Sequence, residues 1–327
     1  MPRSFAARAL VAAVLALLAA AGAARIASGL DLDDGSVRGT AAGTRGACAS
    51  RTPATVAAVQ TFVARRIYAE ELRGAETRLD ATRVATYRPL LTALAHSEPG
   101  AARAAVHALV YAPHWHIVRL RVTRGASVLA DVGGPHVLAP VRGELRVGGR
   151  TAAGFVMSVQ DDLGYVKLVT RFIGAPIDLY QRGTFVMGTL QPAPGVPAAG
   201  ERSQGGYLAA TVPAQAFPAG PLQAALFVAP AASSRSCAAV RAGAFESVAR
   251  HVAARLHPLS AHLEDLADIV RTLTGGHLLV RSGAHRVVGG GPARLPHSGS
   301  VRYAGRLWAV SSWQPLPGVR AFVLSLP

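Results

Sequence analysis

Three groups of polar residues have types and spacings that could support chemistry, and metal binding is the first candidate. His114 and His116 form a His-x-His pair. On a strand this spacing places both rings on one face, as a metal pair requires. No third ligand is identifiable nearby in the sequence, so we expect structural or cavity-lining histidines and no bound metal.

Acid and base catalysis is the second candidate. Asp161 and Asp162 could supply a carboxylate pair, but adjacent residues in a loop point apart, which favours a simple turn. The sequence has no G-x-S-x-G, H-E-x-x-H or P-loop motif. We therefore expect a non-catalytic protein without a cofactor, and a secreted hydrolase is the least favoured alternative.

The third group forms a polar row on a predicted hairpin. Residues 155–160 and 165–172 alternate in polarity, which predicts two strands joined by a loop over residues 161–164. Successive side chains of a strand point to opposite faces, so one face is apolar and belongs to the core. The polar face carries Ser158, Gln160, Lys167 and Arg171.

This row predicts a ligand cavity in the first half of the chain. Two cations beside a partly apolar cavity suit a small carboxylate, because a guanidinium holds a carboxylate with two parallel hydrogen bonds. The alternative is that the row faces water. The expected lining residues are His116, Ser158, Lys167 and Arg171, with Trp115 or Tyr165 as a wall.

The N-terminal segment predicts export. Arg3 and Arg8 precede an apolar run over residues 9–24, which ends near an Ala-x-Ala cleavage pattern. We expect a signal peptide over residues 1–23. The alternative is an uncleaved anchor, which would be the only contact with the membrane. Both place the remaining chain outside the cytoplasm, after a flexible spacer over residues 24–47 that is rich in Gly, Ala, Asp and Thr.

Cysteine usage fits an oxidising compartment. The chain has two cysteines, Cys48 and Cys237. An even count in an exported protein predicts a disulfide between them. The alternative is two independent thiols.

The formal charge of +16 does not predict nucleic-acid binding. Lys167 is the only lysine, and the arginines are scattered singly over the expected strands and helices, without a basic stripe interleaved with aromatic residues. We therefore expect no nucleic-acid partner.

Residues 116–172 and 277–326 show the same order of short matches, which predicts an internal duplication. Each copy follows a cysteine and a helical pattern, so we expect an α+β protein of two modules, each with N-terminal helices and an antiparallel sheet of about five strands. The alternative is two unrelated meanders with common turn residues. The matched residues are Ser158 with Ser312, Gln160 with Gln314 and Gly164 with Gly318.

Composition places the module boundaries. Residues 191–206 are rich in Pro, Ala and Gly, which predicts a linker. The first module is then expected over residues 48–190 and the second over residues 207–327. Two further strands expected within residues 207–230 could belong to either module.

Over residues 48–326 the chain resembles the double Cache (PDC-type, PAS-like) extracytoplasmic sensor domains of bacterial receptors. The most specific stretches are HIVRLRVTRGASVLADVGGP, beginning at His116, and YAGRLWAVSSWQPLPGVRAFVLSL, beginning at Tyr303. The resemblance implies two PAS-like modules, no catalysis, and a ligand cavity between a sheet and its overlying loops. Family ligands are usually small carboxylates or amino acids, but the tyrosine, tryptophan and aspartate set of the amino-acid-binding members is not found here.

Together these features predict an extracytoplasmic, non-catalytic ligand-binding protein of the sensor type. We expect it to recognise a small anionic metabolite. Because no second membrane span or transmitter segment follows the second copy, we expect it to act through a membrane-bound signalling partner. The alternative is a structural or interaction protein of the cell envelope with no small-molecule ligand.

Overall fold

The computed structural model shows an α+β protein with three antiparallel sheets. The predicted signal segment and spacer, His114 and part of the predicted linker lie outside the described residues. No helix in the described part of the chain is long and apolar enough to cross a membrane. The structure describes residue 48 and residues 51–113, 115–134, 137–138, 140–190, 196–202, 206–217 and 220–326.

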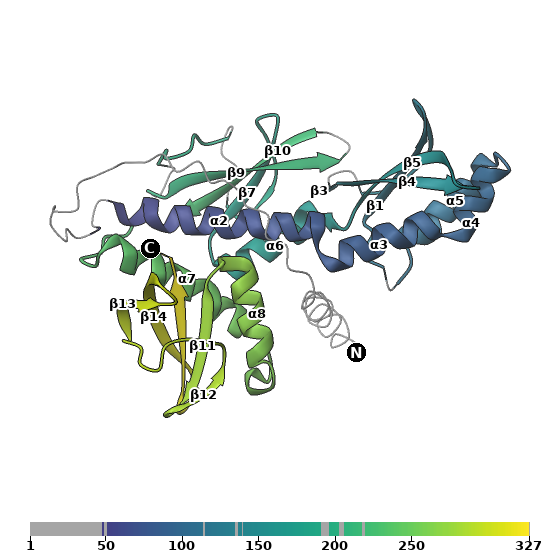
Figure 1. Cartoon of the computed structure of the whole chain (residues 1–327). Coiled ribbons are helices and arrows are strands. Elements are labelled where there is room, and N and C mark those ends of the chain that lie inside the picture. The colour runs from purple at the N-terminus through teal and green to yellow at the C-terminus, as the bar shows by residue number, and fades with distance from the viewer. Residues whose placement is uncertain are drawn as a thin grey trace, which may run out of the picture.

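The long helix α2 (Thr52–Arg73) runs through the centre of the molecule. Pro53 lies in its first turn, where its missing amide hydrogen costs no helical hydrogen bond. Sheet B lies on one side of α2, and helices α7 (Cys237–Ala253) and α8 (Leu263–Thr274) lie on the other (Figure 1). The helix therefore buries residues on more than one face, among them Val59, Val63 and Ile67.

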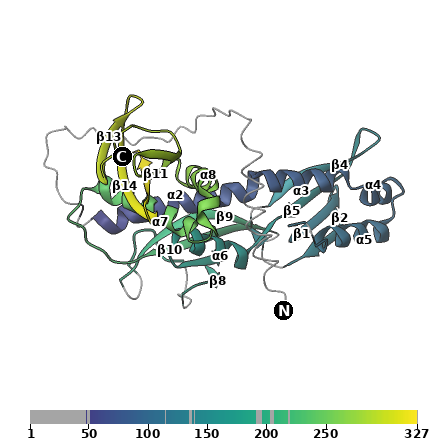
Figure 2. The same ribbon diagram turned by 90° about the horizontal axis from the view of Figure 1, so that it is seen from below.

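Sheet A and three helices form a separate unit at one end of the elongated molecule (Figure 2). We call it the sheet A unit. Its helices are α3 (Ala75–Thr86), α4 (Arg88–Ala95) and α5 (Pro99–Val110). In the order of the sheet, its strands are β2 (Ser127–Gly133), β1 (Arg119–Arg124), β5 (Arg150–Ser158) and β4 (Val141–Val147).

Sheet B contains the strands within residues 207–230, whose module the sequence does not decide. Strand β9 pairs with β3, and β10 pairs with β7, so sheet B joins segments from both sides of the predicted linker. In sheet order its strands are β6 (Gln160–Asp161), β3 (Val137–Leu138), β9 (Leu208–Phe217), β10 (Gly220–Val228), β7 (Ile177–Gln181) and β8 (Thr184–Gly188).

The predicted strand over residues 165–172 is wrong, because this segment lies in helix α6 (Asp162–Ile173). The Asp161 side chain accepts a hydrogen bond from the amide of Gly164 at 2.5 Å and caps the first turn. Gly174 ends the helix in the left-handed conformation, at φ +72°. The predicted hairpin loop is thus a helix start.

Sheet C lies in the C-terminal half of the chain, and helix α7 packs against its strands β14 and β15. The peptide between these strands turns at Gly318, whose φ is +72°. The helices are α7 (Cys237–Ala253), η3 (Leu259–Ala261) and α8 (Leu263–Thr274). In sheet order the strands are β12 (His285–Val288), β11 (His277–Ser282), β15 (Val319–Ser325), β14 (Arg306–Leu316) and β13 (Ser298–Tyr303).

Sheets A and C share part of their strand order, but the residue matches predicted between them are wrong. In each sheet, the strand that comes first in the chain lies between the second and the last strand of that sheet in the chain. The spatial order is β2-β1-β5-β4 in sheet A and β12-β11-β15-β14-β13 in sheet C. Ser158 ends β5, whereas Ser312 lies within β14. Gly164 lies in α6, whereas Gly318 lies in a turn. Equal spacing along the chain does not specify whether a segment is a helix or a strand. The predicted match therefore aligned residues of α6 with residues of the hairpin that β14 and β15 form.

Buried apolar side chains form two large clusters among the described residues. One joins α2, α6, α7 and α8 to sheets B and C, and the other joins α3, α4 and α5 to sheet A. The sheet A unit thus has a core of its own, while sheets B and C share one.

The predicted disulfide is confirmed. Cys48 and Cys237 are bonded, with their Cα atoms 4.8 Å apart, and the bond joins the segment before α2 to the first residue of α7. It closes a span of 189 residues.

Replacing both cysteines by alanine should lower the free energy of unfolding, because the bond restricts the unfolded chain. The loop-entropy relation gives about 5 kcal/mol for a span this long. Urea denaturation with and without reductant measures the effect. The double variant Cys48→Ala/Cys237→Ala also serves as the control for reductant. It has no disulfide, so reductant should not change its urea midpoint. An equal midpoint for the oxidised and reduced wild-type chain would contradict the expected stabilisation.

Candidate functional site

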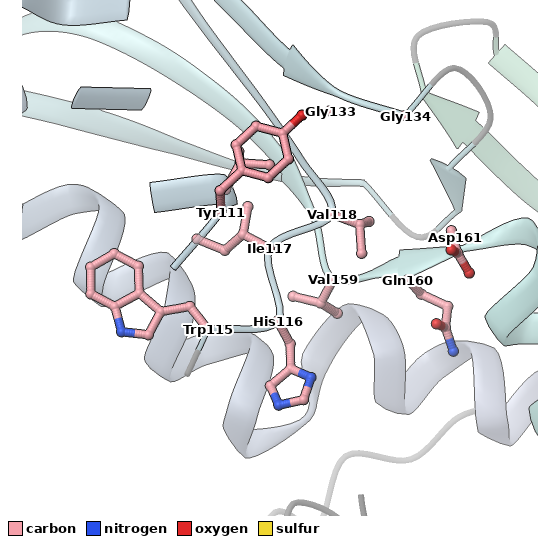
Figure 3. Close-up of a pocket in the computed structure, with 11 residues that line it drawn as sticks. Tyr111, Trp115, His116, Ile117, Val118, Gly133, Gly134, Val159, Gln160 and Asp161 are labelled. Carbon is pink, nitrogen blue, oxygen red and sulfur yellow. The ribbon is translucent and has the colours of Figure 1, made fainter. Parts of the chain in front are cut away.

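A cavity of about 480 Å³ lies where the sheet A unit meets sheet B. We call it the neck cavity (Figure 3). Residues 133–134 lead from β2 towards β3, and residues 159–161 lead from β5 into β6, so the chain passes between the two sheets at this point. The lining residues are Val110, Tyr111, Trp115, His116, Ile117, Val118, Gly133, Gly134, Val159, Gln160 and Asp161.

Trp115 and His116, both predicted from the sequence, line the neck cavity. The Trp115 ring packs edge-on against Tyr87, with centroids 5.8 Å apart, and the guanidinium of Arg83 lies 5.8 Å from its centroid. His116 Nε2 lies 3.1 Å from Glu76 Oε1 on α3. These contacts hold both rings from the side of α3.

The His116 side of the cavity borders a group of acidic side chains. Burial raises the pKa of Glu76, the charge of Asp80 adds to this effect, and His116 and Arg83 oppose it. Burial, with the charges of Glu76 and Glu70, raises the pKa of Glu71 from 4.5 to about 7. A proton therefore binds in this region near neutral pH.

Polar groups at the other end of the cavity come from β6, directly before α6. Gln160 and Asp161 lie opposite Tyr111 and Trp115 (Figure 3). One Asp161 oxygen, Oδ1, accepts from the amide of Gly164, and this bond fixes the direction of the carboxylate. The cavity therefore combines an aromatic wall with carboxylate and amide groups.

Two arginines beside the cavity share one carboxylate. Asp131 accepts from Arg119 Nε and Nη2, each at 2.9 Å, and from Arg121 Nε and Nη2, at 2.9 and 2.6 Å. Both guanidiniums also lie over the ring of Phe217 at the end of β9, 5.1 and 4.9 Å from its centroid. We call these four residues the junction cluster, because they join β1 and β2 of sheet A to sheet B.

The junction cluster also fixes the turn that lines the cavity. Arg119 Nη1 donates to the carbonyl of Gly134 at 2.5 Å. Gly133 has φ +128°, and a Cβ there would lie 2.3 Å from the carbonyl oxygen of Val118, so this position requires glycine. Burial alone would raise the pKa of Asp131, but the hydrogen bonds and charges of Arg119 and Arg121 hold it below its ordinary value.

The other predicted lining residues lie outside the neck cavity. Ser158 is fully buried, and its hydroxyl lies within hydrogen-bond distance of the carbonyl oxygens of Leu138 and Gln160. Tyr165 is a core residue of α6 and donates to the carbonyl of Ala64 at 3.2 Å. Lys167 is exposed on α6, and Arg171 lies one turn further along the same helix. The polar row does not form, because its second half is helical.

Two features of the site went unpredicted although the sequence carries a signal for each. In α6, the apolar residues that become buried recur at helical spacing, which a strand would not require. In the junction cluster, Arg119 and Arg121 stand two residues apart on one strand and therefore share a face. Their common partner, Asp131, lies on the neighbouring strand, where it pairs with Arg121 in the register. The buried α6 residues are Tyr165, Val166, Val169, Phe172 and Ile173.

Within the described residues, no group of three or more His, Cys, Asp and Glu side chains could hold a metal ion. His114, the other half of the His-x-His pair, lies outside them. In sequence the chain matches no known family model and no curated protein. The site must therefore be interpreted from its own geometry.

Replacing Asp131 by Asn should destabilise the protein. The substitution removes the carboxylate shared by two partly buried guanidiniums, and we expect a loss of about 2 kcal/mol in the free energy of unfolding. Urea denaturation measures the loss. Glu144→Gln is the matched control, because Glu144 pairs with Arg146 on the exposed surface and its loss should leave the midpoint nearly unchanged. Equal effects of the two substitutions would contradict a structural role for the junction cluster.

Glu71 should make the protein less stable as the pH rises. Its folded pKa of about 7 lies above the ordinary 4.5, so between these values the folded state binds more protons than the unfolded state. The stabilising contribution of Glu71 to the free energy of unfolding is complete below pH 4.5 and is lost as the pH approaches 7. At pH 8, Glu71→Gln should be more stable than wild type by about 2 kcal/mol.

Urea midpoints from pH 4.5 to 8 test this expectation. Glu98→Gln, an exposed residue before α5, controls for the loss of one negative charge. If Glu71→Gln shows the same dependence on pH as wild type, the proton is not on Glu71.

Proposed function

We propose that the protein is a non-catalytic, extracytoplasmic ligand-binding module of the sensor type, which binds a small metabolite in the neck cavity and acts through a partner. One observation carries the proposal: the two segments that connect sheet A to sheet B line the cavity, together with the end of α5 and the segment that follows it. A ligand bound there would contact both parts of the molecule. The volume of the neck cavity, about 480 Å³, lies within the usual range for small-molecule sites.

The lining residues favour a ligand with an apolar part and hydrogen-bond donors. Tyr111 and Trp115 offer aromatic surface, whereas Gln160 and Asp161 offer acceptor oxygens. Amino or hydroxyl groups would suit that end. Lys167, on which the expected preference for an anion partly depends, is on the exposed surface of α6, so the neck cavity itself gives no support for an anionic ligand.

A sensor role is supported by the position of the junction cluster. Gly134 both lines the cavity and accepts from Arg119, so a ligand that moves this turn would act on the contact between the sheets. The disulfide supports an oxidising, extracytoplasmic location. The common part of the strand orders of sheets A and C is compatible with the double Cache resemblance, which we retain as part of this proposal.

A thermal-shift screen of the purified oxidised protein against small metabolites tests the proposal, because a ligand that binds the folded state raises the melting temperature. Tyr111→Ala should weaken binding of a hit with an apolar part and hydrogen-bond donors, the chemistry that suits the neck cavity, on the order of tenfold, since an aromatic contact is lost. The Tyr111 side chain is 64% exposed, so its removal should leave the fold intact.

Lys167→Ala and Arg171→Ala serve as controls, and both should bind the hit as wild type does. A hit that depends on these α6 residues but not on Tyr111 would move the site away from the neck cavity. The complete absence of a hit in a broad screen would favour the envelope interaction protein instead.

A further inference from the structure

A second cavity, of about 530 Å³, lies between α2, α7 and β9. We call it the helix cavity. It shares no lining residue with the neck cavity. The lining residues are Ala54, Ala57, Ala58, Val59, Thr61, Phe62, Arg65, Ala199, Gly200, Leu208, Ala209, Ala210, Thr211, Arg241 and Phe245.

The floor of the helix cavity is apolar because small residues follow one face of α2. Ala54, Ala57, Ala58 and Phe62 recur at three- and four-residue intervals, which places them on one side of the helix. Phe62 packs edge-on against Phe245 of α7, with centroids 6.2 Å apart. The short alanine side chains leave space beside this aromatic pair.

Two guanidiniums, from Arg65 and Arg241, line the same cavity. Arg241 Nε is buried and has no hydrogen-bond partner in the part of the chain that the structure describes. The guanidinium of Arg241 lies 5.8 Å from the centroid of the Phe245 ring, a contact that supplies no acceptor for Nε. A buried donor without a partner is costly, and an acceptor bound in the cavity would satisfy it.

The charges around the helix cavity favour an anion. Its described lining residues include no Asp or Glu. The disulfide holds the N-terminal ends of α2 and α7 together, and Ala54 and Arg241 both lie near these ends. The positive end of the α2 dipole, at Ala54 in the first turn, therefore adds to the charge of the arginines.

We infer that the helix cavity binds a small carboxylate with an apolar body. Arg241 holds the carboxylate with charge-assisted hydrogen bonds, and Arg65 adds a second positive charge. The apolar body lies on the alanine face of α2, beside Phe62 and Phe245. This site goes beyond the proposed function, because it uses different residues and a different ligand chemistry from the neck cavity.

Isothermal titration calorimetry of the full, oxidised chain with octanoate tests the inference. Octanamide, which has the same apolar body without the charge, is the matched probe. We expect octanoate to bind on the order of tenfold or more tightly than octanamide. Across hexanoate, octanoate and decanoate the affinity should rise by about fourfold per added CH₂ until the apolar floor is covered.

Substitutions assign the contact to the two arginines. Arg241→Gln should weaken octanoate binding on the order of tenfold or more, and Arg65→Gln by about threefold. Arg73→Gln is the control, because Arg73 is an exposed arginine on the same helix that does not line the cavity. It should bind octanoate as wild type does. Because Arg65 is exposed, Arg65→Gln keeps the test informative even if Arg241→Gln fails to fold.

Two results would overturn the inference: no heat of octanoate binding to the wild-type chain, or the same affinity in wild type, Arg65→Gln and Arg241→Gln. Tyr111→Ala separates the two cavities, since it should leave octanoate binding unchanged. Loss of octanoate binding in Tyr111→Ala would place the carboxylate in the neck cavity and overturn the assignment to Arg241.

Discussion

The burial of α2 is the constraint on which the rest of the structure depends. This helix lies between sheet B and the helices that cover sheet C, so its side chains contribute to a core that both sheets share. Val63 and Ala64 are fully buried there, and the backbone of Ala64 accepts from Tyr165 of α6. A fully buried aliphatic side chain is worth about 1.5–3 kcal/mol, so a helix buried on several sides holds the two sheets together. The disulfide fixes the start of the same helix to the start of α7.

The sheet A unit is attached differently, through charge and aromatic contact as well as chain connections. Asp131 pairs with both Arg119 and Arg121, whose side chains are 12% and 28% exposed, and Phe217 covers both guanidiniums from sheet B. Charge-assisted hydrogen bonds in such partly buried places are stronger than those of the exposed pair between Glu144 and Arg146. Because Asp131 satisfies these cations, they support the neck cavity structurally. The arginines of the helix cavity have no such carboxylate among the described lining residues.

Several features could be predicted from local sequence, whereas helix α6 was not predicted. The helical patterns predicted beside the two cysteines are present as α2 and α7, and the predicted disulfide is confirmed. Residues 165–172 were wrongly predicted as a strand because their β-branched and aromatic residues also suit a sheet. The Asp161 cap and Gly174 terminus decide for a helix, and a cap can be recognised only when the register of the first turn is known. This single error displaced Lys167 and Arg171 from the expected site.

By itself, the sequence determined the α+β class and the disulfide. Each depends on local pattern or on residue count. Only the tertiary structure decided that β9 and β10 join sheet B and that Asp131 accepts hydrogen bonds from both Arg119 and Arg121. It also decided that Arg65 and Arg241 line one cavity. These contacts join residues far apart in the chain or on different elements, and their energies depend on burial and on the direction of each side chain. Neither property can be read from spacing along the chain, because it is the packing around α2 that sets them.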